Sequence, residues 1–183
     1  MLQKIRHAMG ERDGNYYLSG IVELDEAFFG APTEGGKRGR GTDKTPVLVS
    51  ISLTEDGKPN IANMQVVDNL DGATVEAYAQ DNVAKGTQIR TDGLTIYSGL
   101  SSSGYLLTQI QYDPKKQPKH LHWLHIIISN AKSFIDGTYH GLDKKHLQRY
   151  LDEFCYRFNR RWFQSGIFSR LLDACVASND SLP

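Results

Sequence analysis

Three carboxylates stand close together in an apolar segment near the amino-terminal end of the chain. Residues 21–30 read IVELDEAFFG, so Glu23, Asp25 and Glu26 lie among Ile, Val, Leu and Phe residues. Side chains alternate along a β-strand, which puts Glu23 and Asp25 on one face and Glu26 on the other. A buried carboxylate persists by pairing, by taking up a proton or by binding a metal. The alternative is a strand that frays before Asp25 and leaves the three acids in water.

A fourth carboxylate of interest follows a second predicted strand. In QIRTDGLTIYSG, the strand ends at Asp92 and a turn begins at the next glycine. The carboxyl ends of strands are common positions for functional sites in α/β sheets. An Asx turn is the ordinary alternative for Asp followed by Gly, and the residues alone leave both interpretations open.

Polar side chains also line one face of a predicted helix in LHWLHIIISNAKSF. His122, His125, Ser129 and Lys132 are spaced by three, four and three residues, so they form one stripe. A lone histidine on such a helix is usually a satisfied core residue, but two histidines and a lysine on one stripe favour a polar site. Asn130 lies well round the helix from that stripe.

Oxygen and nitrogen ligands from separated segments suit a divalent ion such as Mg²⁺ or Mn²⁺. Two such ions can stabilise both the attacking and the leaving oxygen in phosphodiester chemistry. Zinc is disfavoured because the histidines crowd one helix and the cysteines lack ligand spacing. A metal site would therefore account for the carboxylates at the start of the chain.

The elements that must position these side chains follow from the pattern of apolar residues. Strands alternate with a period of two, and helices repeat their apolar residues every three or four positions. Strands are expected at 21–30, 46–59, 60–69, 88–92 and 105–112, and helices at 73–86, 120–137 and 143–162. A short helical or turn segment is expected at 95–100. The first three strands predict a meander, and Gly86 is the expected helix terminator. This order predicts a mixed sheet with helical cover in one α/β domain.

Length and composition limit the classes of protein that fit. The chain has 183 residues and a formal net charge of zero, which suits one domain and argues against strong non-specific nucleic-acid binding. No apolar run approaches the ~20 residues that cross a membrane, and the amino-terminal MLQKIRHAMG is too polar for a signal peptide. A cytoplasmic protein is expected. Cys155 and Cys175 lack CxxC spacing and are expected to be reduced core thiols.

Four segments, in this order, resemble bacterial insertion-sequence transposases of the DDE superfamily. They are VELDEAFFG, GKRGRGTDKT, RTDGLTIYSGL and GTYHGLDKKHLQRYLDEFCYRFNRR, and together they cover most of the chain. The chain is most similar to the branch of these mobile-element enzymes whose third catalytic residue is Glu, Asn or His. The resemblance implies an integrase-like, RNase H-like α/β fold, with a five-stranded mixed sheet flanked by helices.

The resemblance also implies the catalytic residues. Asp25 matches the first catalytic aspartate, and Asp92 matches the second. Many relatives carry Glu at the third position and Lys seven residues later. Lys132 matches that lysine, so His125 stands where the Glu would be, and Asn130 is the alternative third residue.

A metal site follows from this match. Asp25, Asp92 and His125 are expected to hold Mg²⁺ or Mn²⁺, in the two-metal arrangement that the resemblance implies, with Glu23 as a supporter on the same face. Imidazole suits Mg²⁺ less well than oxygen ligands do, so the replacement of Glu by His affects the expected metal preference.

Basic side chains in two regions are candidate contacts to the DNA backbone, which they would position without reading its sequence. One region is the glycine-rich loop GGKRGRG, for which a solvated surface loop is an equal alternative. The other is the last predicted helix. The candidates are Lys37, Arg38, Arg40, Lys144, Lys145, Arg157, Arg160 and Arg161. His140 is expected to be structural or close to DNA rather than a metal ligand.

The resemblance implies a catalytic domain at 20–175, between a lead-in segment at 1–19 and a disordered tail at 176–183. Its expected activity is metal-dependent cleavage of element ends and strand transfer into target DNA. A homodimer is expected because transposition pairs two ends, and association with the nucleoid is expected on DNA. Relatives usually carry an amino-terminal zinc-ribbon or helix-turn-helix segment, so sequence-specific recognition of the ends is not expected in this chain. The alternatives are an RNase H-like nuclease that never joins strands and an inactive DNA-binding remnant.

Overall fold

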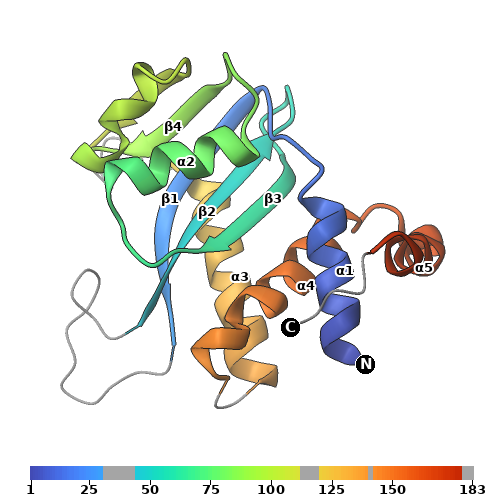
Figure 1. Ribbon diagram of the computed structural model, residues 1–183. Coiled ribbons are helices and arrows are strands. Elements are labelled where there is room, and N and C mark those ends of the chain that lie inside the picture. Colours follow the sequence, from blue (N-terminus) through green and yellow to red (C-terminus); the bar gives the residue numbers. More distant parts are fainter. Residues whose placement is uncertain (31–43, 112–119, 140–141, 179–183) are drawn as a thin grey trace.

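Five strands pair into one mixed sheet in the described part of the chain. The computed structural model describes residues 1–30, 44–111, 120–139 and 142–178. The strands are β1 (Ile21–Phe29), β2 (Thr45–Leu53), β3 (Pro59–Val66), β4 (Gln88–Asp92) and β5 (Leu106–Ile110), in the spatial order β3-β2-β1-β4-β5 (Figure 1). β2 is antiparallel to β1 and β3, whereas β4 is parallel to β1 and β5. The expected meander and the expected RNase H-like fold class are both confirmed by this topology.

Helices cover both faces of the sheet. The helical segments are α1 (Leu2–Asp13), α2 (Gly72–Asn82), η1 (Thr95–Ser101), α3 (His122–Thr138), η2 (Lys144–His146), α4 (Leu147–Asn159), η3 (Gln164–Gly166) and α5 (Ile167–Ala177). α2 and η1 lie on one face, α3 and α4 on the other, and α1 and α5 lie outside α4 (Figure 1). Alternation along β1 explains the two cores, because Val22 and Leu24 pack toward α2 while Ala27 and Phe29 pack toward α3.

The edge strand β3 is covered by side chains of α4. The side-chain amide of Gln148 donates to the Met64 carbonyl and accepts from the Val66 amide. Asn159 bonds the amide and the carbonyl of Ala62 in the same way. Backbone groups on an open strand edge invite pairing with another chain, so these two amides close this edge while they dock α4.

α1 occupies the segment that the sequence left unassigned. Arg6 is buried, donates to Glu153 at 2.8 Å and stacks over the Tyr150 ring, which fastens α1 to α4. The predicted lead-in segment is therefore a packed helix in this structure. α5 also continues to Ala177, beyond the predicted domain boundary at 175.

Two further expectations need correction. α2 ends at Asn82, before Gly86, because the backbone around Val83 turns extended and hydrogen-bonds Leu18. Cys155 is buried as expected, but Cys175 on α5 is exposed and is not a core thiol.

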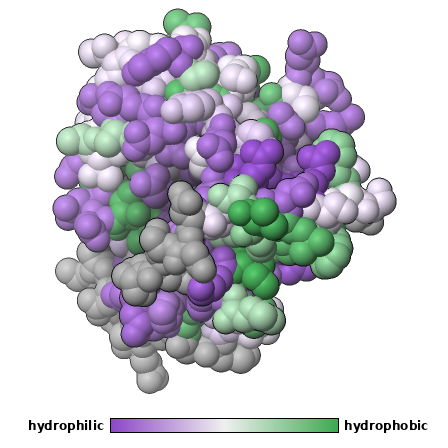
Figure 2. All heavy atoms as spheres, turned by 45° about the vertical axis from the view of Figure 1, so that its right-hand side comes forward, coloured by the Kyte–Doolittle hydropathy of each residue, from purple (hydrophilic) through white to green (hydrophobic). Residues whose placement is uncertain are grey.

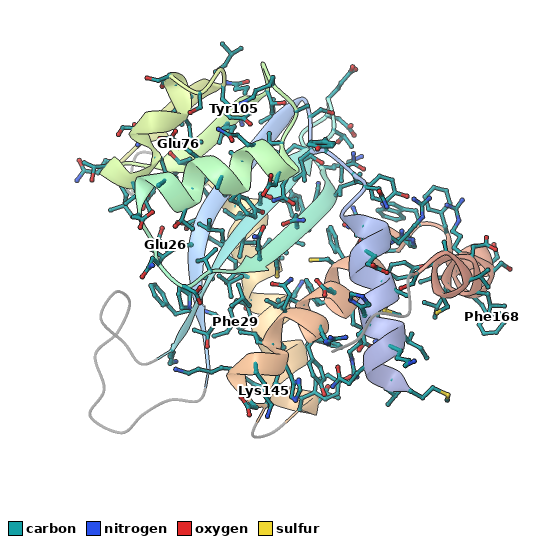
Figure 3. The ribbon with its side chains drawn as sticks, viewed as in Figure 1. Glu26, Phe29, Glu76, Tyr105, Lys145 and Phe168 are labelled. Carbon is teal, nitrogen blue, oxygen red and sulfur yellow. The ribbon has the colours of Figure 1, made fainter. Side chains whose placement is uncertain are left out.

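Exposed large apolar side chains gather on α5 and on the turn before it. They include Trp162, Phe163, Phe168, Leu172 and Val176. Figure 2, in which the side of the molecule that carries α5 is turned forward, shows apolar side chains grouped on that face. Figure 3 shows Phe168 pointing outward from α5. Among the described residues, no helix has the length and apolar character of a membrane span.

Candidate active site

Glu23 joins the central strand to the start of α3. Its carboxylate accepts a hydrogen bond of 3.1 Å from the backbone amide of Leu124, the third residue of that helix. The first amides of a helix have no partners within the helix, and the helix dipole favours negative charge there. Glu23 is 4% exposed, and burial raises its pKa, while the Leu124 amide and the Arg90 charge oppose that rise. Glu23 thus caps α3 from β1.

Asp25 faces α3 at His125, the residue that follows Leu124. Its Oδ2 lies 3.6 Å from Nε2 of His125, and its Oδ1 accepts from the backbone amide of Glu26. The Asp25 side chain is 16% exposed and that of His125 is 49% exposed, so the pair lies where the sheet meets solvent. The contact with Asp25 raises the pKa of His125, and burial opposes the rise. At 3.6 Å the contact is a charge interaction rather than a short hydrogen bond.

Asp92 follows the part of β4 that pairs in parallel with β1. The ladder between β1 and β4 pairs Glu23 with Arg90. That ladder ends at Glu23 and Arg90, and Asp25 and Asp92 follow two residues further along each strand. Strand alternation directs both side chains to the α3 face. Asp92 also accepts from the Leu94 amide at 3.1 Å. The Asx turn is therefore present, and the site role of Asp92 stays a prediction.

Glu26 faces the opposite side of the sheet, as the alternation predicts. Its Oε2 accepts a hydrogen bond of 2.6 Å from the hydroxyl of Tyr97, a fully buried residue of η1. Burial and the nearby negative charges of Glu26, Asp25 and Asp92 raise the pKa of Tyr97. The sequence reasoning missed Tyr97, although its place five residues after Asp92 was a usable signal.

Lys132 lies further along the same edge of α3. Its Nζ is 5.7 Å from the centre of the Phe29 ring, near the far end of β1. Burial and the charge of Lys44 lower the pKa of Lys132. Glu26 and Phe29, both labelled in Figure 3, mark the part of β1 that runs past these residues. Asn130 is exposed on α3, and no contact of its side chain with Asp25 or Asp92 is observed in the described structure.

A family comparison covers this whole arrangement. The model of the ISXO2-like transposase domain matches residues 17–159, well over half of the chain. The chain belongs to this transposase family. The matched region includes β1, β4, α3 and α4, and with them Asp25, Asp92, His125 and Lys132. No curated protein sequence matches the chain significantly.

Solved structures with a similar arrangement include a chain of the simian T-cell lymphotropic virus intasome in complex with PP2A regulatory subunit B56 gamma. It is 13% identical, with a TM-score of 0.46, and the match covers 75% of this chain and 48% of that one. The Mos1 transposase paired-end complex with left transposon end is 11% identical, with a TM-score of 0.37 and coverage of 93% and 62%. The Mos1 mariner paired-end complex with Mn is 10% identical, with a TM-score of 0.35 and coverage of 100% and 63%.

The chain spans about half to two-thirds of the length of those solved chains, between 48% and 63%. The fold assignment rests on the sheet topology of the chain itself and on the family match, because similarity at this level adds nothing to either.

The predicted DNA contacts of this transposase domain differ in how far their side chains are buried. Lys144, Lys145 and Arg157 are exposed, and Lys145 pairs with Asp143 at 3.2 Å. Arg161 is partly buried and donates to backbone carbonyls of Asn60 and Phe158. Lys37, Arg38, Arg40 and His140 lie outside the described residues.

Arg160 needs a correction. It is 5% exposed, donates to Asp13 at 2.7 Å and stacks 3.5 Å above the Tyr156 ring. These contacts hold α4 against the end of α1. A guanidinium enclosed in this way has no surface to offer to DNA, so we exclude Arg160 from the candidate DNA contacts.

The donor set fits a hard divalent ion in its chemistry. Two carboxylates, Asp25 and Asp92, and the imidazole of His125 are ligand types that Mg²⁺ and Mn²⁺ accept, and all three face one side of the sheet. Within the described ranges, no three His, Cys, Asp or Glu side chains are already gathered closely enough to hold one ion. The three side chains would therefore have to come closer together to hold one ion.

Proposed function

We propose that this chain is the catalytic domain of a DNA transposase that cleaves the ends of its element and transfers them to target DNA. One observation carries the proposal within a transposase family. Asp25 and Asp92 each follow, by two residues, the paired part of the parallel strands β1 and β4, and His125 faces Asp25 from α3. Asp25, Asp92 and His125 would hold Mg²⁺ or Mn²⁺, and a bound divalent ion supplies stabilisation of the attacking and leaving oxygens.

The protein's own residues position this set. Glu23 fixes the start of α3, which sets the distance between His125 and Asp25. Tyr97 and Glu26 join η1 to β1 on the other face and so hold the turn that follows Asp92. The role proposed for Lys132 is to contact a DNA phosphate next to the carboxylates, since its ammonium lies on the same edge of α3.

The exposed cations Lys144, Lys145 and Arg157 are the proposed contacts to the DNA backbone among the described residues. They would contribute affinity without sequence readout, and the affinity they add should fall as salt rises. The proposal extends to Lys37, Arg38 and Arg40 on the strength of the sequence alone. DNA-bound protein would be found on the nucleoid in the cytoplasm.

Cleavage and joining can be tested with the full chain, Mn²⁺ and duplexes that carry the DNA flanking the gene. Asp25→Asn and Asp92→Asn should abolish both nicked and joined products, because each removes a charged oxygen ligand while keeping its size. Asp81→Asn, on the exposed side of α2, is the matched control and should retain both. Full activity in either site variant would refute the assignment.

The products of the same reaction distinguish the proposal from its alternatives. Nicked product without any joined product, at all metal and DNA concentrations, would identify a nuclease that does not transfer strands. Specific DNA binding with neither product would identify an inactive remnant. The histidine at the third position motivates this second alternative.

We also propose that the chain forms a homodimer through the apolar surface of α5 and the turn before it. Three aromatic residues there are more than half exposed, and a buried aromatic covers about 150–250 Å². With Leu172 and Val176 the surface reaches on the order of 500 Å², more than half of what each partner buries in a specific interface. Light scattering should give twice the chain mass, and Phe168→Asp should give the monomer mass.

A further inference from the structure

His120 carries a buried ring nitrogen that has no hydrogen-bond partner. Its Nε2 is inaccessible to solvent, and no donor or acceptor of the described structure bonds it. The large majority of buried side-chain polar atoms in native proteins are paired, and an ion or a water is one explanation of an exception. His120 lies two residues before the first residue of α3, and it was not among the residues singled out from the sequence.

The other ring nitrogen identifies the tautomer. His120 forms a hydrogen bond with the backbone of Thr91, and this bond favours the protonated ring, so the ring donates to the Thr91 carbonyl. Because Nε2 has no partner, the donor is Nδ1. The neutral ring then carries its hydrogen on Nδ1 and a lone pair on Nε2. Histidines that bind metals usually have this arrangement, in which one nitrogen donates to a carbonyl and the other coordinates.

The position of His120 connects it with the candidate site. Thr91 directly precedes Asp92 at the end of β4, and the charges of His125, Asp25 and Arg90 all act on the pKa of the His120 ring. Leu121, the next residue, is the one non-glycine residue with positive φ (49°) in the described part of the chain. The left-handed conformation of Leu121 turns the backbone between His120 and the first residue of α3. The Leu121 side chain is buried, at 2% exposure.

We propose that Nε2 of His120 is a further ligand of the divalent ion held by Asp25 and Asp92. This inference rests on the proposed metal-dependent function and adds a second imidazole to the ligand set. The competing role is a structural one, in which His120 only ties the end of β4 to the start of α3 through Thr91.

A substitution can separate the two roles. In His120→Asn the side-chain amide stands where Nδ1 stood, so the hydrogen bond to Thr91 is retained and Nε2 is lost. The Mn²⁺ affinity of the full chain, measured from the free-ion signal in electron paramagnetic resonance, should fall roughly tenfold or more. The melting temperature without metal should not change. His7→Asn, on α1 away from the candidate site, is the matched control and should bind Mn²⁺ as the wild type does.

A second measurement keeps the inference testable if His120→Asn folds poorly. Pulsed paramagnetic resonance detects nitrogen bound to Mn²⁺, and the double variant His122→Asn/His125→Asn should keep a nitrogen coupling that comes from His120. Absence of that coupling, or wild-type affinity in a folded His120→Asn, would overturn the role of His120. The proposed metal site itself would be refuted only if Asp25→Asn and Asp92→Asn also left the Mn²⁺ affinity unchanged.

Discussion

Arg160 offers a direct test of how the structure divides packing residues from DNA contacts. Arg157 and Arg160 are basic residues three positions apart at the end of α4, and the sequence suggested the same role for both. Arg160 pairs with Asp13, and the two side chains are 6% and 10% exposed. The Arg157 side chain is 61% exposed and lies 3.4 Å from Glu153. The perturbation is Arg160→Met, which removes the charge and keeps most of the aliphatic volume.

The expected loss follows from the charge that remains. Arg160→Met leaves the Asp13 carboxylate in a buried position with Asn159 as its remaining side-chain donor among the contacts described above. Burial already raises the pKa of Asp13 even with Arg160 beside it, so the pair only partly offsets the cost of desolvation. Breaking a buried pair in this way costs about 3–5 kcal/mol. For a chain of this size the melting temperature should fall by about 6–20 °C.

The assay combines unfolding and binding. Thermal and urea unfolding, followed by circular dichroism, should show the loss for Arg160→Met and a change within about 0.5 kcal/mol for Arg157→Met, whose ion pair is exposed. DNA binding should be measured by fluorescence anisotropy at several salt concentrations that span on the order of one decade. The logarithm of the binding constant should fall less steeply with the logarithm of the salt concentration for Arg157→Met than for the wild type. Wild-type stability together with weakened DNA binding in Arg160→Met would refute the reasoning.

Two other changes have expected outcomes set by buried polar groups. Burial raises the pKa of Asp152 to about 7, above its value of about 3.9 in an unfolded chain, so its ionisation should lower stability as pH rises from about 4 to 7. Asp152→Asn should remove that slope in urea titrations and stabilise the protein at pH 8; an unchanged slope would contradict this. Tyr97→Phe removes the donor to Glu26 and should cost about 1.5–3 kcal/mol in the same titration, whereas Tyr17→Phe on the surface should cost nothing measurable.

Local pattern was enough to predict the sheet and the direction of its side chains. The period of two along IVELDEAFF places Glu23 and Asp25 opposite Glu26, and the contacts with Leu124, His125 and Tyr97 agree with it. Side-chain direction in a strand depends only on the backbone, so it can be read without knowing the partners. The short strand ending at Asp92 was predictable for the same reason.

The amino-terminal helix and the end of α2 were not predictable in this way. α1 has a weak apolar pattern. Arg6 is buried there because Glu153 on α4 accepts its hydrogen bond and the Tyr150 ring stacks against its guanidinium. Gly86 was a reasonable terminator by local chemistry, but pairing with Leu18 ended α2 earlier. In both cases a distant segment supplied the interaction that decided the local structure.

The sequence by itself indicated Asp25, Asp92, His125 and Lys132 as candidate site residues, through strand alternation, helical spacing and the resemblance to the transposase family, and their catalytic roles stay predictions. Only the tertiary structure decided which partners they have. Glu23 proved to be the cap of a helix about a hundred residues later, and Arg160 proved to be half of a buried pair with Asp13. The physical reason is that charge and hydrogen bonding act over a few ångströms in space, and those distances are set by packing between segments that sequence spacing does not relate.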